Sequence, residues 1–276
     1  AVKILVDREK QRTKFVQNEY WSLQGNFKSD KGNIFSKLLS IKGEKVATGN
    51  DFNKETGTLA TSNTVILDKE GAENLVKSLG SNDWKVSDLE TKPKTQNPYP
   101  PFITSTLQQE GIRKLRMNST QIMRVAQGLY ENGYITYMRT DSIHLSTEAL
   151  NASRKVIEEK YGKKYLPKSP KLYKSKSKNA QEAHEAIRPA GSTFRDPNSL
   201  KNVLTDIEYK VYDLIWKRTV ASQMNSAKTE QTKLQISDKD YIFVANGKTI
   251  IFPGFLRAYV EGADDPSATL DDMEKT

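Results

Sequence analysis

The spacing of apolar residues changes twice along the chain. Residues 19–65 carry short apolar runs separated by Gly, Asn and Asp, and a similar pattern returns at residues 232–252. Apolar runs bounded by turn formers predict β-strands. The residues between them repeat apolar positions at intervals of three and four, which predicts amphipathic helices. This order predicts an α+β chain, with a discontinuous β hinge domain at 17–92 and 222–262 and a mainly helical domain inserted at 93–221.

Two of the predicted helices form a helix-turn-helix-like unit within the insert. The helix at 104–115 places Leu107 and Ile112 on one side. The next helix is expected to begin with Ser119 as its N-cap and to be closed by Gly133, since these residue types are typical of the two helix ends. Two helices joined by about four residues fit this motif.

Turn formers and charged residues predict the remaining boundaries. Residues 92–101 hold four of the ten prolines. Because proline interrupts helices and central strands, this segment is predicted to be a linker. The pair Asn246-Gly247 predicts a tight hairpin turn.

Residues 1–16 resemble the end of a helix that enters from a preceding domain, and the chain starts without Met, so we expect a piece of a larger protein. Residues 263–276 predict an acidic tail.

The positive charge is concentrated in one segment. The whole chain has 43 Lys and Arg against 34 Asp and Glu, a net charge of +9. Residues 91–190 alone contain 18 Lys and Arg against 8 Asp and Glu. A localised basic segment indicates a polyanion partner, although a solvated lysine-rich surface would have the same composition.

Composition excludes several kinds of site. The chain has no cysteine, which excludes disulfides and cysteine-ligated metals. It has only two histidines, His144 and His184, so a metal site with several histidine ligands is not expected. We find neither an apolar span of about 18 residues nor a signal peptide, so we expect a soluble, cytoplasmic protein without a membrane partner.

A tyrosine and an arginine lie two positions apart in GYITYMRTDS, residues 133–142. Alternation in a short extended stretch would place Tyr137 and Arg139 on one face. A free phenol has a pKa of about 10, so forming phenolate at neutral pH costs about 4 kcal/mol. A nearby guanidinium favours the phenolate and binds phosphate bidentately. The pair suits phosphoryl transfer to tyrosine, but a core tyrosine beside a surface arginine has the same spacing.

Four segments resemble one enzyme family. GYITYMRTDS resembles the active-site segment of the type IA DNA topoisomerases, the bacterial topoisomerase I group. PPFITSTLQQEG at 100–111 and AQEAHEAIRP at 180–189 occur in that family in the same order. VDREKQRTKFVQNEYW at 6–21 resembles the exit from its fourth domain, so residues 1–16 would end a helix of a DNA-groove domain. The resemblance covers nearly the whole chain.

The resemblance implies a role for each matching residue. Tyr137 would attack a phosphodiester in single-stranded DNA, forming a 5′-phosphotyrosyl bond and releasing a 3′-hydroxyl. Strand passage and religation would then relax negative supercoils. Arg139 would contact the scissile phosphate, and His184 would help to bind DNA. Asp141 would be an orienting hydrogen-bond partner in the DNA site, with a turn aspartate as the alternative. Glu185 and Arg188 are expected to bond within the domain.

The same resemblance implies parts that this sequence does not contain. The family carries a Toprim domain with a catalytic glutamate and a D-x-D-x-E cluster that binds Mg²⁺, and no D-x-D-x-E occurs here. We therefore expect Mg²⁺ only in the full-length enzyme. The Toprim and DNA-groove domains of the same polypeptide would be partners of this chain. Alone, it is expected to bind single-stranded DNA without relaxing supercoils.

A non-catalytic helix-turn-helix DNA-binding module is the alternative function. It would read duplex DNA sequence-specifically, and Tyr137 would then be structural. Other enzymes that use tyrosine on DNA fit less well. Rolling-circle initiators need a closely spaced histidine pair, whereas His144 and His184 are far apart in sequence. Tyrosine recombinases need an Arg/His/Arg array whose spacing is not found.

Overall fold

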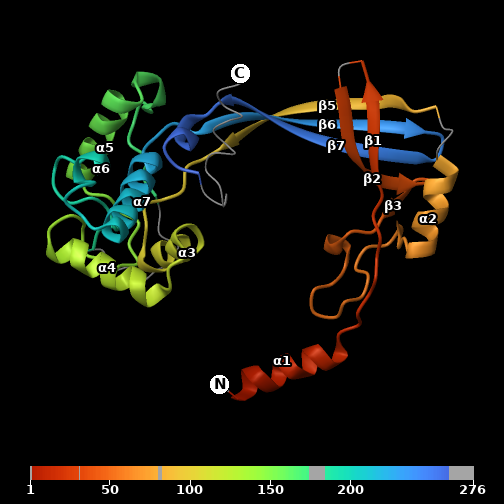
Figure 1. The fold of residues 1–276 in the computed structure, drawn as a ribbon, viewed down its shortest axis with the longest axis horizontal. Coiled ribbons are helices and arrows are strands. Elements are labelled where there is room, and N and C mark those ends of the chain that lie inside the picture. Colours follow the sequence, from red (N-terminus) through yellow and green to blue (C-terminus); the bar gives the residue numbers. More distant parts are fainter. Residues whose placement is uncertain (1, 31, 80–82, 174–183, 261–276) are drawn as a thin grey trace. The chain divides into compact units, whose positions relative to one another are not determined.

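Contacts in the computed structural model divide the chain between two units, drawn in Figure 1. The structure describes residues 2–30, 32–79, 83–173 and 184–260. Within those limits, the first unit comprises residues 1–92 and 230–249, and the second comprises residues 93–229 and 250–276. The expected acidic tail at 263–276 lies outside the described residues, as do residues 174–183, which include the start of the AQEAHEAIRP motif.

One mixed sheet contains the seven strands. Its order is β4-β3-β2-β7-β6-β5, and β1 pairs with β2. The strands are β1 (Gln24–Ser29), β2 (Gly32–Ile41), β3 (Glu44–Val46), β4 (Thr64–Val65), β5 (Lys85–Gln96), β6 (Ala227–Asp238) and β7 (Tyr241–Phe252). β2 runs antiparallel to β1, β3 and β7, whereas β3 and β4 are parallel. By their bounds, β5, β6 and β7 each contribute a few residues to the second unit.

The first unit has a small aromatic core. Phe27, Trp84 and Phe243 meet edge to face, with ring centres 5.2 to 5.4 Å apart, an arrangement that aromatic rings favour. Helix α2 (Lys69–Ser78) adds Ala72 to the same cluster, and its N-cap Asp68 accepts a 2.7 Å hydrogen bond from the Gly71 amide. A short 3₁₀ helix, η1 (Gly49–Asp51), also belongs to this unit. Helix α1 (Val2–Lys14) has no buried residue.

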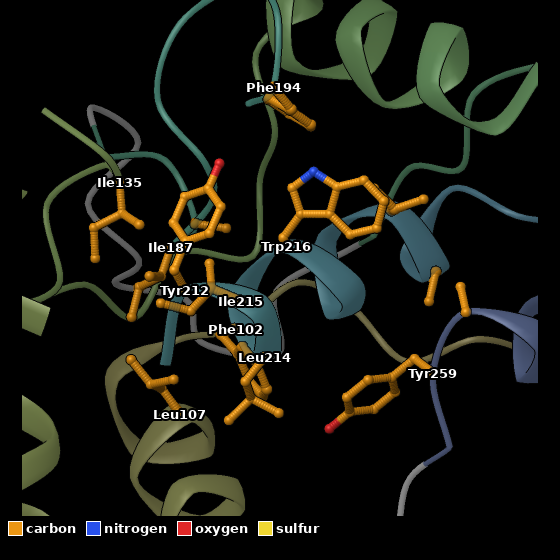
Figure 2. Packing of buried hydrophobic residues seen from close by; sticks show 14 of the residues in the cluster. Phe102, Leu107, Ile135, Ile187, Phe194, Tyr212, Leu214, Ile215, Trp216 and Tyr259 are labelled. Carbon is orange, nitrogen blue, oxygen red and sulfur yellow. The ribbon is translucent and has the colours of Figure 1, made fainter. Parts of the chain in front are cut away.

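The second unit is helical and is built around one central helix. Its elements are α3 (Thr104–Leu115), α4 (Ser119–Glu131), α5 (Thr147–Lys160), η3 (Lys163–Tyr165), α6 (Pro197–Leu200), α7 (Asp206–Ser222) and η4 (Gly254–Arg257). Figure 2 shows Tyr212, Ile215 and Trp216 of α7 among buried side chains that other segments supply. A helix that is apolar on most sides is typical of such a buried position.

A buried arginine joins α7 to the segment before α3. Arg218 donates through Nε to the carbonyl of Pro100 at 2.6 Å. Its guanidinium also lies 4.8 Å from the ring centre of Phe102 and 5.3 Å from that of Tyr259. Because a buried guanidinium needs such partners, this cluster fixes the chain that leads into α3.

The prediction of a linker at 92–101 was wrong for its first half. β5 continues through Pro93 to Gln96. It ends the strand order, so it is an edge strand, and an edge tolerates a residue that has no N–H to donate. The second half, at residues 97–101, contains no strand or helix.

Three other local predictions were also wrong. Asn246-Gly247 lies inside β7, and the β6–β7 turn falls at Lys239, whose φ is 47°. Pairing of β7 within the sheet overrides the local turn preference of that dipeptide. The N-cap of α4 is Asn118 rather than Ser119, because the Asn118 side chain accepts from the Gln121 amide at 2.9 Å. Ile112 is 48% exposed, so it does not join Leu107 in the core.

Among the described residues, no helix combines the length and the apolar character needed to cross a membrane.

Candidate active site

Two sets of hydrogen bonds hold the chain on either side of Tyr137. Before it, the Thr136 amide donates to the Arg188 carbonyl at 2.9 Å, and the Thr136 hydroxyl donates to the Ala186 carbonyl at 2.7 Å. The Ala190 amide donates to the Tyr134 carbonyl at 2.9 Å. Residues 134–136 are thereby bound to residues 186–190, which lie about fifty positions later in the sequence.

Thr104, the first residue of α3, holds the chain after Tyr137. Its hydroxyl donates to the carbonyls of Met138 and Thr140 at 2.8 and 3.1 Å, and accepts from the Thr140 amide at 2.9 Å. The Thr104 amide donates to the Thr140 carbonyl at 2.9 Å. The start of a helix therefore fixes the backbone on both sides of Arg139.

Tyr137 lies between these two anchors with an accessible side chain. It is 41% exposed, and its ring meets that of Tyr130 on α4 edge to face at 5.2 Å between centres. The expected alternation holds only in part. Tyr137 and Arg139 are both exposed, but Ile135 is 2% exposed, and the segment has bends and one isolated bridge to Pro189 instead of a strand. The two anchors, and not a β-ladder, determine its path.

A hollow of about 500 Å³ brings together three of the four candidate residues. Arg139, Asp141 and His184 line it, together with Thr104 and Gln108 of α3. Tyr137 is not part of this lining, although it is only two residues from Arg139. Within the described residues, the Asp141 side chain has no hydrogen-bond partner. Both the orienting role and the turn-aspartate alternative therefore stay predictions. His144 does not line the hollow; its carbonyl accepts from the Ala186 amide at 2.8 Å.

Glu185 and Arg188 bond within the unit, as predicted. Arg188 is 5% exposed and donates through Nη2 to Glu185 Oε2 at 2.7 Å. Glu185 Oε1 accepts from the Ser146 amide, also at 2.7 Å. Burial opposes ionisation of Glu185, but the hydrogen bonds from Arg188 and Ser146 outweigh it and lower the pKa of that carboxyl below its usual value. This ion pair stabilises the segment that follows His184.

Comparison with known proteins identifies the family. A family model described as DNA topoisomerase matches residues 1–276. The chain belongs to the type IA DNA topoisomerases. DNA topoisomerase 1 of Synechococcus elongatus is 51% identical over 275 residues, covering 99% of this chain and 31% of that protein. DNA topoisomerase 1 of Streptomyces coelicolor is 48% identical over 287 residues, covering 100% of this chain and 30% of that protein. The chain thus spans about a third of the length of these topoisomerases.

A solved topoisomerase structure is also similar. Full-length topoisomerase I from Thermotoga maritima matches with a TM-score of 0.68 and 30% sequence identity, covering 95% of this chain and 39% of that one. The mixed α/β fold described above is therefore that of a topoisomerase I segment.

The residues described in this topoisomerase chain do not fit a Mg²⁺ site. Mg²⁺ prefers several oxygen ligands in octahedral geometry, most often carboxylates. No group of three or more histidine or acidic side chains gathers anywhere in the described part of the chain. Asp141 is the one acidic residue among those that line the hollow. We therefore derive no step through a metal from these residues.

Sequence reasoning assigned no role to the residues that position the topoisomerase segment. Thr104 and Thr136 provide the two anchors, and Tyr130 packs on Tyr137. The signal for Thr104 was its place in PPFITSTLQQEG at the start of a predicted helix. Nothing in the sequence indicated that its partners would be Met138 and Thr140.

Replacement of Thr104 by valine should loosen the backbone around Arg139. Valine has a similar shape but leaves the Thr140 amide and two carbonyls without the hydroxyl, which costs about 1–3 kcal/mol. Hydrogen exchange of the Thr140 amide in the 276-residue chain should then be about ten- to a hundredfold faster. Thr104→Ser retains the hydroxyl and is the matched control. Equal exchange rates in both variants would show that the hydroxyl does not hold this segment.

Proposed function

We propose that this chain is the tyrosine-bearing part of a type IA topoisomerase that cleaves one DNA strand transiently. The Tyr137 phenol oxygen attacks the phosphorus of a phosphodiester in single-stranded DNA. The bond from phosphorus to the 3′ oxygen breaks as the 5′-phosphotyrosyl bond forms. The phenol loses its proton, and the departing 3′ oxygen gains one to become a hydroxyl. Religation is the reverse reaction.

One observation supports this proposal most strongly. Arg139, Asp141 and His184 come from two segments far apart in sequence, and yet they line the same hollow, with exposed Tyr137 two residues from Arg139. A core tyrosine would be buried, whereas this side chain is accessible to a DNA strand. Together with family membership, this arrangement favours the catalytic interpretation over the structural one.

Electrostatics assign the role of Arg139. Attack by phenolate carries a cost of about 4 kcal/mol at neutral pH. A guanidinium at the scissile phosphate stabilises the charge that accumulates on the non-bridging oxygens, and it does so bidentately. In this proposal His184 binds the strand beside that phosphate, and Asp141 orients a neighbouring donor by accepting its hydrogen bond.

The other parts of the enzyme complete the reaction in this proposal. The acidic residues of a Toprim domain would hold Mg²⁺, which would supply positive charge to the reaction. Residues 1–16 end the DNA-groove domain, and the β-rich domain at 17–92 and 222–262 is the hinge that opens for strand passage. The whole enzyme relaxes negative supercoils in the bacterial cytoplasm. The 276-residue chain alone binds single-stranded DNA without relaxing it.

DNA binding by the 276-residue chain tests the proposal. We expect it to bind a short oligodeoxythymidylate in preference to a duplex of equal length. The affinity should fall steeply with added salt, since each phosphate neutralised releases condensed counterions. Fluorescence anisotropy at several salt concentrations measures both properties, with a plasmid relaxation assay beside it. Sequence-specific duplex binding would support the helix-turn-helix alternative instead, and Mg²⁺-dependent relaxation by this chain would contradict its dependence on other domains.

A further inference from the structure

A second hollow lies next to the one that holds the candidate residues. It has a volume of about 360 Å³ and is lined by Gln108 and Arg139, which also line the first, and by residues of α4. The α4 residues include Ser119, Thr120, Arg124 and Gln127. The two hollows are therefore neighbours, and the side chains of Gln108 and Arg139 line both of them.

The charges around this second hollow are unbalanced. Arg124 and Arg139 are both exposed, and neither forms an ion pair with a carboxylate in the described part of the chain. No acidic residue lines the hollow. The other polar groups on its wall are the hydroxyls of Ser119 and Thr120 and the amides of Gln108 and Gln127, of which Gln127 donates to Glu131 at 2.9 Å. Met123 is the remaining lining residue. Two guanidinium groups with hydroxyl and amide donors suit an anion that has several oxygens.

The α4 residues of the hollow continue toward Tyr137. Thr120, Arg124, Gln127 and Tyr130 follow one another at intervals of four, three and three, so they form one stripe on the helix. All four are exposed. Tyr130, at the far end, contacts the ring of Tyr137. Arg124 and Tyr130 are six residues apart, about 9 Å along the helix, so a strand that reaches Tyr137 can extend along α4 to Arg124.

We propose that the second hollow binds a backbone phosphate of the single-stranded DNA, adjacent to the phosphate held at Arg139. Arg124 binds this second phosphate, and Arg139 contributes to both positions. The proposal rests on the function proposed above and adds a subsite to it. Because the contacts are to phosphate and not to base edges, the subsite increases affinity without sequence preference.

The salt dependence of binding tests the role of Arg124. For single strands, the slope of log affinity against log salt changes by about 0.7 for each phosphate that is no longer neutralised. In the 276-residue chain, Arg124→Gln should weaken binding of an oligodeoxythymidylate several-fold and reduce the slope by about that amount. Arg124→Lys should retain the slope and recover part of the affinity, because lysine keeps the charge but loses the bidentate geometry. The side chain is exposed, so these variants should fold.

The matched control is Lys210→Gln on α7. Lys210 is also exposed, lies on the same unit and lines neither hollow. It should leave both the affinity and the slope almost unchanged. An equal change in the Arg124 and Lys210 variants would show a general charge effect and overturn the subsite. An Arg124→Gln variant that binds like the unaltered chain would overturn the subsite alone and leave the proposed function standing.

Two further outcomes address the ligand itself. If the unaltered chain does not bind the oligonucleotide, both the subsite and the proposed DNA binding are wrong. If a polyglutamate peptide of matched charge competes as well as the oligonucleotide, the hollow is a site for acidic proteins, and the DNA subsite is overturned.

Discussion

The Tyr137→Phe variant should form no covalent DNA adduct while it binds DNA almost as well as the unaltered protein. Phenylalanine retains the ring that packs on Tyr130 at 5.2 Å and removes the oxygen alone. The assay needs the rest of the enzyme, so this chain should replace the matching segment of the Synechococcus elongatus topoisomerase, to which it is 51% identical. The chimera is incubated with a labelled oligonucleotide, and the adduct is followed by denaturing gel.

Tyr130→Phe is the control for this variant. It removes a hydroxyl from a neighbouring exposed tyrosine and should leave the adduct in place. An adduct that survives in the Tyr137 variant and disappears in the Tyr130 variant would identify Tyr130 as the nucleophile and contradict our assignment.

The second large effect is expected at Arg139. In the same chimera, Arg139→Ala should slow cleavage by about 10²–10³-fold, because one preorganised contact to developing charge contributes about 3–4 kcal/mol to transition-state stabilisation. Arg139→Lys should restore only part of the rate, since an ammonium group cannot bind two phosphate oxygens in the same planar geometry. Single-turnover cleavage separates this effect on the chemical step from an effect on binding. A lysine variant with the full rate would show that a point charge is sufficient.

The helices could be predicted from sequence because their signals are local. The predicted helix at 104–115 has the observed bounds of α3. Predictions that depended on tertiary pairing did worse. Pro93 is tolerated because β5 is an edge strand, and Asn246-Gly247 is part of a strand because β7 is paired between β2 and β6 in the sheet. Neither the edge position of β5 nor the pairing of β7 can be predicted from the local sequence.

The candidate site also has features that the sequence could predict and features that depend on tertiary contacts. Resemblance selected Tyr137, Arg139, Asp141 and His184, and the structure brings the last three to one hollow. Their roles remain proposals. The residues that hold the segment in place were not predicted, because Thr104 and Thr136 act through partners about 36 and 50 positions away. A threonine pattern in sequence does not indicate such distant carbonyls.

The long sequence separation between Thr136 and its partner Ala186 also determines when Tyr137 can become ordered. The Thr136 hydroxyl bonds to the Ala186 carbonyl, 50 residues later. Closing a loop of that length precedes any gain from the contact, so such pairings form slowly. On the ribosome, where the N-terminal part emerges first, α3 and α4 can form while Ala186 is still unsynthesised. The tyrosine therefore acquires its complete native path only after about fifty further residues have been added. A nascent chain that stops at α5 would have the nucleophile and the Thr104 anchor, but not the anchor that precedes Tyr137.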